Sequence, residues 1–104
     1  VNVQSFDPAI LEVMHQKYPD IELAYLVGEN TYAENKKNLT FKPEIYSPYY
    51  KLLDSTEVSS IRKDGLQIIP WTVNNPEDIE AVIKLKVDGI ITDYPERVIE
   101  KLER

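Results

Sequence analysis

Three acidic residues, Asp7, Glu29 and Asp93, each follow a strand-like segment of the sequence. Carboxylates that converge from several strand ends can bind a hard cation such as Ca²⁺ or Mg²⁺. However, Asp7 directly precedes Pro8, and Asp93 lies just before Pro95. An acidic residue in that position commonly caps the N-terminus of a helix. We therefore expect helix capping for Asp7 and Asp93, and we assign no metal ligand in this chain.

The residue types of nucleophilic and acid–base catalysis are scarce. The sequence contains no cysteine and a single histidine, His15. No second base or orienting group accompanies His15 in its helix-like segment, which is typical of a surface histidine rather than of a general base. The glycines are scattered at element boundaries and form no phosphate-binding loop. We therefore predict no catalytic residue in this chain.

Aromatic residues are the remaining candidates for a binding surface. Trp71 lies in an apolar segment, and a large ring at a strand's carboxyl end can line a pocket and donate through its indole nitrogen. Packing in the core explains a tryptophan on a buried strand equally well, so both interpretations stay open. Tyr46, Tyr49 and Tyr50 surround a Ser-Pro turn, where one pair could face a pocket while the third faces a helix.

A repeating strand and helix pattern must position these residues. Strand-like segments occupy residues 1–6, 21–27, 44–47, 66–73 and 89–93. A helix or helix-like segment follows each of them, at residues 7–18, within 28–42, at 55–64, from 75 onward and at 95–102. Consecutive strand–helix units indicate an α/β fold with a parallel sheet, whose functional surface lies at the carboxyl ends of the strands.

Local signals predict where several helices begin and end. Asp54 and Glu57 have the spacing of a capping box, and Gly65 stands where a helix over residues 55–64 would end. Asn30 is the expected cap of a short helix in the polar stretch 28–42.

Composition limits the classes of protein that fit. With 104 residues, 42% of them hydrophobic and 29% charged, the chain has the makeup of one domain. It is much shorter than the ~250 residues typical of a complete α/β barrel. The net charge of -6 argues against a nucleic acid partner, and no apolar run is long enough for a membrane span.

Three motifs together resemble one enzyme family. They are Gln-Ser-Phe-Asp-Pro at residues 4–8, Trp-Thr-Val-Asn at 71–74, and Val-Asp-Gly-Ile-Ile-Thr-Asp-Tyr-Pro at 87–95. These segments resemble strands of glycerophosphodiester phosphodiesterases, and the likeness covers essentially the whole chain. One departure is Lys86, which stands where family members often have glycine, so the preceding helix must end with a different cap or with strain.

The resemblance implies a fold and a function. Members are (β/α)8 barrels that hydrolyse glycerophosphodiesters to an alcohol and glycerol 3-phosphate, with a divalent cation, Ca²⁺ or Mg²⁺, and acid–base histidines. By resemblance, residues 1–104 are the C-terminal part of an incomplete TIM (β/α)8 barrel, roughly its last five parallel βα units. The substrate-binding positions that carry over are Trp71 and, on weaker grounds, Phe6. The catalytic histidine and metal motifs of the earlier strands are not in this sequence.

Two alternatives belong to other classes of protein. One is a non-catalytic α/β module that binds a partner or a small ligand, and the other is a half-barrel that self-associates. Five barrel strands alone leave two unpaired edges, so such a chain should form a homodimer or recruit a missing N-terminal half.

Overall fold

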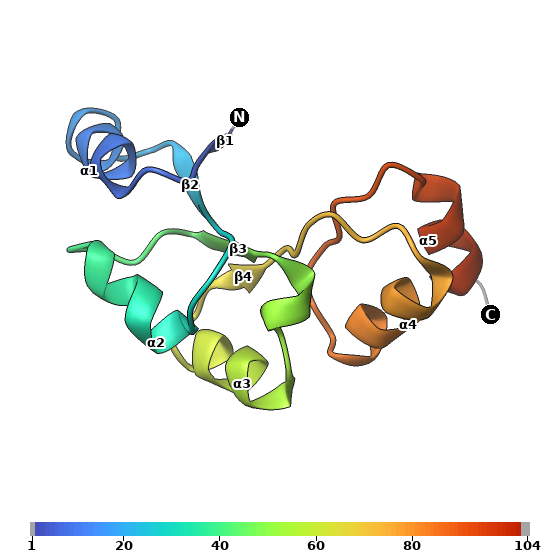
Figure 1. Ribbon diagram of the computed structural model, residues 1–104. Coiled ribbons are helices and arrows are strands. Elements are labelled where there is room, and N and C mark those ends of the chain that lie inside the picture. The colour runs from blue at the N-terminus through green and yellow to red at the C-terminus, as the bar shows by residue number, and fades with distance from the viewer. Residues whose placement is uncertain (1, 103–104) are drawn as a thin grey trace.

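Strands and helices alternate along most of the chain, as the sequence pattern predicts. The structure is a computed structural model that describes residues 2–102, so the first residue of the predicted strand 1–6 lies outside the described residues (Figure 1). The elements are β1 (Asn2–Ser5), α1 (Pro8–Lys17), β2 (Glu22–Val27), α2 (Tyr32–Asn35), β3 (Ile45–Pro48), α3 (Ser55–Lys63), β4 (Gln67–Ile68), α4 (Pro76–Lys84) and α5 (Pro95–Leu102). Two short 3-10 turns follow α2 and β3, namely η1 (Lys36–Asn38) and η2 (Tyr50–Leu52).

The strands form one parallel sheet in the order β1-β2-β3-β4, so each strand pairs with its neighbours in the sequence. Register aligns Ser5 with Tyr25, Tyr25 with Tyr46, and Tyr46 with Ile68. These side chains share one face of the sheet because side chains alternate along a strand. The expected α/β fold with a parallel sheet is confirmed.

The prediction of a fifth strand at residues 89–93 was wrong, because this segment pairs irregularly. Ile91 donates to the carbonyl of Pro70 and accepts from the amide of Val73, both at 2.9 Å. A regular parallel ladder would join Ile91 to residues two apart, whereas these are three apart, so one extra residue interrupts the ladder. The amides of Gln67, Ile69 and Trp71 donate to carbonyls of β3 and the residue before it, but Pro48 of β3 has no amide hydrogen to donate in return, which limits β4 to two residues within the predicted 66–73.

Capping explains why α3 begins and ends as it does. The carboxylate of Asp54 accepts from the amide of Glu57 at 2.8 Å, and Gly65 follows the helix with a φ of 83°. The capping box is only half formed, since the Glu57 carboxylate accepts from the amide of Tyr32 at 2.9 Å instead. Glu57 therefore ties the start of α2 to α3.

Two residues adopt the left-handed backbone region without being glycine. Asn30 has a φ of 67°. The prediction that Asn30 caps α2 was wrong, because Thr31 is the cap and its hydroxyl accepts from the backbone amide of Glu34. Lys86 has a φ of 61° just after α4, where a glycine would be unstrained. The helix α4 therefore ends with backbone strain at Lys86, one of the two outcomes expected from the absence of glycine there.

Two apolar clusters lie between the sheet and the helices. The larger one contains Leu11 of α1, Leu23 of β2, Ile61 of α3 and Ile68 of β4, all at most 1% exposed. The smaller one gathers the buried residues of α4 and the preceding segment against α5. Among the described residues, no helix is long and apolar enough to cross a membrane.

The outermost helices keep apolar side chains exposed. On α1, Ile10 and Val13 are 49% and 50% exposed, and on α5, Ile99 and Leu102 are 54% and 66% exposed. The two helices lie at opposite sides of the molecule, which extends 43 Å along its longest axis (Figure 1). Each end of the row of βα units thus presents an apolar helix face.

Asp88 provides a test of how the closing segment is held. Its carboxylate accepts from the Ile68 amide of β4 and from the Arg62 guanidinium of α3, both at 2.7 Å. We expect Asp88→Ala to lower the free energy of unfolding by about 1–3 kcal/mol, because the Ile68 amide loses its acceptor. Urea denaturation measures this.

The matched control is Asp20→Ala, at an exposed aspartate that makes no hydrogen bond or ion pair within residues 2–102. It should change the free energy by less than about 0.5 kcal/mol. Equal losses in the two variants would contradict this role of Asp88.

Candidate functional site

The carboxyl ends of the strands meet at one edge of the sheet. Phe6 follows β1, Gly28 follows β2, Tyr49 follows β3, and Trp71 lies three residues beyond β4. Parallel strands in register bring these positions to the same edge, where the ligand sites of α/β proteins lie.

Trp71 is held by a hydrogen bond and by its neighbours. Its indole nitrogen donates to the carbonyl of Ser47 at 2.8 Å, and its backbone forms an isolated parallel bridge with Tyr49. The Tyr49 and Trp71 rings lie 5.4 Å apart at a tilt of 45°. Because Trp71 is half-buried, it packs with one side and leaves part of its ring accessible. Both roles that the sequence left open are thus compatible with its position.

The structure brings together the two predicted site residues. Phe6 and Trp71 lie edge to face, with ring centroids 5.7 Å apart and planes at 83°. Phe6 is 58% exposed, which is high for a phenylalanine. A side chain added at Gly28 would begin 4.0 Å from the Trp71 ring, so the loop after β2 lies along that ring. Residues from three strand ends therefore form one aromatic surface, defined here as the strand-end wall: Phe6, Tyr49 and Trp71.

A hollow of about 280 Å³ adjoins this wall. It is lined by Phe6 and by residues of the loop that follows β2, including Gly28, Glu29 and Asn30. Trp71 does not line it. The accessible space beside the strand-end wall thus lies over the ends of β1 and β2.

Only one of the three tyrosines near the Ser-Pro turn belongs to the wall. Tyr49 contacts Trp71, whereas the hydroxyl of Tyr50 donates to Asp78 of α4 at 3.1 Å. Desolvation, with this hydrogen bond to Asp78 as the second cause, raises the pKa of Tyr50. Tyr46 is buried on the helix-covered face of the sheet. The expectation that a pair of them faces one pocket was therefore wrong, because the strand register turns Tyr46 away.

Asn74 connects two strand-end loops, a role that the sequence analysis missed. Its side-chain oxygen accepts from the amide of Asp93 at 2.9 Å and from the hydroxyl of Thr92 at 3.1 Å. Its side-chain nitrogen donates to the Asp93 carboxylate at 3.0 Å, and its backbone carbonyl accepts from Arg97 at 2.7 Å. The signal was present in the sequence, since Asn74 and residues 92–93 belong to two of the quoted motifs.

The acidic residues do not gather into a cation site. Asp7 caps α1 as predicted, since its carboxylate accepts from the amide of Ala9 at 2.9 Å. The prediction that Asp93 caps a helix was wrong, because its carboxylate accepts from the side-chain amide of Asn74. Within the part of the chain that the structure describes, no three histidine, cysteine or acidic residues lie close enough to hold a metal. The residues present therefore do not fit a metal centre.

His15 lies on the surface of α1, as its sequence context predicts. Its ring is exposed and stacks on Phe41 at a centroid distance of 4.0 Å. One turn earlier, the carboxylate of Glu12 accepts from the backbone and hydroxyl of Thr40, which lowers the pKa of Glu12. These contacts fasten α1 to the loop before β3 and lie away from the strand-end wall.

Comparison with protein families matches residues 1–97 to the glycerophosphoryl diester phosphodiesterase family. A curated relative, the glycerophosphodiester phosphodiesterase of Bacillus altitudinis, is 34% identical over 102 residues, which cover 96% of this chain and 42% of the relative. That of Caldanaerobacter subterraneus subsp. tengcongensis is 39% identical over 69 residues, which cover 64% of this chain and 28% of the relative. The chain thus spans less than half the length of these relatives.

Solved structures share the fold. A glycerophosphodiester phosphodiesterase from Parabacteroides distasonis matches with a TM-score of 0.80 at 28% identity, over 98% of this chain and 42% of the other. An Oleispira antarctica phosphodiesterase, solved with the product sn-glycerol-3-phosphate, matches with a TM-score of 0.80 at 19% identity, over 97% of this chain and 41% of the other.

The Asn74 network gives a local prediction. In Asn74→Ala, the amide of Asp93 loses its side-chain acceptor, so its hydrogen exchange should become about fivefold faster, which corresponds to about 1 kcal/mol. Amide exchange followed by NMR measures this. The neighbouring Asn75 has no side-chain capping bond, so Asn75→Ala should leave that rate unchanged. An unchanged rate in Asn74→Ala would contradict the proposed link.

Proposed function

The chain belongs to the glycerophosphoryl diester phosphodiesterase family, and on this basis we propose that it is the C-terminal part of such an enzyme. The whole protein would hydrolyse glycerophosphodiesters to an alcohol and glycerol 3-phosphate. The observation that carries the proposal is the family match over residues 1–97, which coincides with the parallel sheet in sequential strand order.

We propose that the fold is an incomplete (β/α)8 barrel. Sequential parallel pairing is the strand order of such a barrel, in which every helix packs between two others. The exposed apolar residues on α1 and α5 support this proposal, because the missing units of a barrel would cover those two helices. Complete burial of an apolar side chain of this size stabilises by about 1.5–3 kcal/mol, and these side chains, already about half-buried, would gain roughly half of that.

The role of this chain would be to bind and orient the substrate. The strand-end wall of Phe6, Tyr49 and Trp71 offers ring faces and edges on which the carbon atoms of a glycerol moiety can pack. Its exposed member, Phe6, would lose water when the substrate binds. Asn74 would hold the two adjoining loops in place around the wall.

A divalent cation, Ca²⁺ or Mg²⁺, is implied by the family resemblance, but the described residues do not fit it. In the proposed enzyme, the metal ligands and the acid–base histidines belong to barrel units outside residues 1–104.

A second candidate is a half-barrel that pairs with another copy of itself. The same exposed faces of α1 and α5 favour it, because a second copy could cover them as well as missing barrel units could. The two candidates differ in activity, since only the complete enzyme would hydrolyse a phosphodiester.

Trp71 provides the test of the proposed pocket. In the complete barrel, we expect Trp71→Ala to lower kcat/KM for glycerophosphocholine roughly tenfold, which corresponds to about 1.4 kcal/mol of lost transition-state binding. Steady-state kinetics and a melting temperature measured on the same sample separate this loss from a loss of stability.

Trp71→Phe keeps an aromatic ring and should retain most of the activity. The matched control is Tyr18→Ala, at an exposed ring just after α1 and remote from the strand ends. A Trp71→Ala enzyme with a reduced melting temperature and unchanged kcat/KM would show that the ring serves packing alone.

A further inference from the structure

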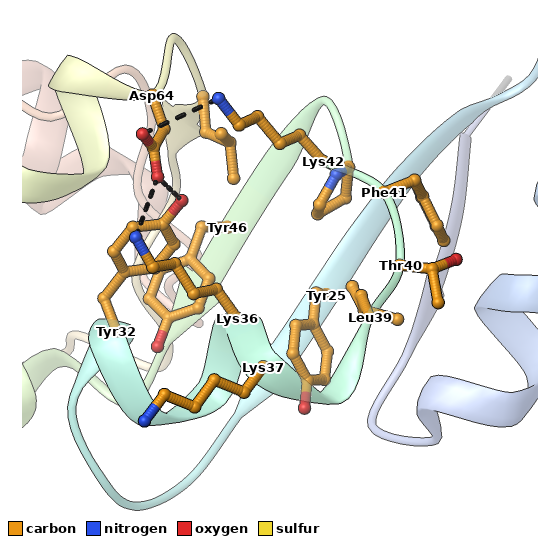
Figure 2. Close-up of a pocket in the computed structure, with 12 residues that line it drawn as sticks. Tyr25, Tyr32, Lys36, Lys37, Leu39, Thr40, Phe41, Lys42, Tyr46 and Asp64 are labelled. Atoms are coloured by element: carbon orange, nitrogen blue, oxygen red, sulfur yellow. Dashed lines mark hydrogen bonds and ion pairs between the residues drawn. The ribbon is translucent and has the colours of Figure 1, made fainter.

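A second and larger cavity, of about 470 Å³, lies on the helix-covered face of the sheet (Figure 2). Neither Phe6 nor Trp71 lines it. Its lining includes Pro43, Asp64 and Leu66, which precede β3 and β4, so it extends toward the amino ends of the strands. Its volume falls within the roughly 300–1,000 Å³ of small-molecule sites. This cavity is therefore distinct from the strand-end wall.

The connection between β2 and β3 leaves this cavity open because its helix is short. That connection contains only α2, of four residues, and the three-residue turn η1, whereas α1 has ten residues and α3 has nine. Within the described residues, no long helix therefore lies between α1, which packs against β1 and β2, and α3, which packs against β4. Tyr25 of β2, Tyr46 of β3 and the buried Leu39 form the floor (Figure 2). The buried Leu66 also lines it.

The floor is aromatic and uncharged. The rings of Tyr25 and Tyr46 lie 6.3 Å apart, and those of Tyr32 and Tyr46 lie 4.9 Å apart, both edge to face. Burial raises the pKa of Tyr46 to about 12, so its phenol stays neutral at physiological pH. Its hydroxyl accepts from the side-chain amide of Asn35 at 3.0 Å, and that of Tyr25 accepts from Asn38 at 3.1 Å. The floor thus suits a flat aromatic molecule.

The rim of the cavity carries positive charge. Lys36 and Lys42 approach the two carboxylate oxygens of Asp64 to 3.6 and 3.7 Å (Figure 2). Asp64 also accepts from the hydroxyl of Tyr32 at 2.6 Å, and this bond is the main reason that its pKa is lowered. With Lys37, three lysines and one carboxylate line the cavity, in a chain whose net charge is -6. The cavity is thus locally cationic.

Within residues 2–102, surface interactions alone hold Lys36 and Lys42: each approaches Asp64, and the Lys36 ammonium group also lies 5.4 Å from the centre of the Tyr32 ring. The side chains of Lys36 and Lys42 are 52% and 66% exposed, and exposed ion pairs of this kind contribute little to stability. An anionic ligand group at the mouth can therefore bind these ammonium groups in place of Asp64, with little loss of folding stability. Tyr32 still holds Asp64 by its hydroxyl when the lysines move.

We propose that this cavity binds an aromatic monoanion. The aromatic rings lie on the floor formed by Tyr25, Tyr46, Leu39 and Leu66, and the carboxylate or sulfonate lies at the mouth, where the exposed ammonium groups of Lys36 and Lys42 turn outward from Asp64 to meet it. The inference does not depend on the proposed function, because it uses no residue of the strand-end wall.

The test is an NMR titration of the ¹⁵N-labelled protein with 2-naphthoate. We expect saturable amide shifts at residues 36–42 and 64–66. The neutral analogue 2-naphthalenemethanol has the same ring system without the charge and should bind about tenfold more weakly, because it gains nothing from two lysines. Affinity for the anion should also fall as salt is raised.

Substitutions then assign the charge recognition. Lys36→Gln and Lys42→Gln should each weaken 2-naphthoate binding about three- to fivefold, whereas Lys84→Gln on α4, outside the cavity, should leave it unchanged. Equal binding of the acid and the alcohol, equal affinity in all three variants, or shifts confined to the exposed faces of α1 and α5 would overturn the proposal. Absence of any saturable shift would overturn it as well.

Discussion

The parallel hydrogen-bond ladder from β1 to β4 is the constraint on which the rest of this structure depends. Because each strand pairs with its neighbours in sequence, every connection must return to the amino end of the sheet and start the next strand beside the last. The carboxyl ends of the strands are thereby gathered at one edge. The same order places α1 and α5 at opposite ends of the row, where each keeps an apolar face exposed.

One ladder thus produces two unlike surfaces. At the carboxyl ends, Phe6 and Trp71 meet although 65 positions separate them in the sequence, because β1 and β4 end at the same edge. On the helix-covered face, the four-residue helix α2 between β2 and β3 does not cover the strands, and a cavity with an aromatic floor and a cationic rim is left. We propose the first surface as part of a substrate pocket, whereas the second is proposed from this chain's own residues alone.

The sequence predicted the features that depend on local chemistry. The cap at Asp54 and the proline-led start of α4 follow from short patterns of residues, and the parallel sheet follows from the strand–helix units repeated along the chain. It did not predict the features that depend on tertiary pairing. The segment 89–93 has a strand-like composition, but its pairing with residues 70 and 73 is irregular, and Asp93 binds Asn74 rather than capping a helix. The cavity could not be predicted either, since it depends on a helix being too short to cover two strands that lie side by side.

Sedimentation of the purified chain tests the incomplete barrel most directly. If residues 1–104 are part of a barrel, the chain alone should self-associate, because association removes the exposed apolar faces of α1 and α5 from water. It should form a one-to-one complex when the N-terminal half of a homologous barrel is added. A heat-stable monomer that forms no complex with the added N-terminal half would contradict the account.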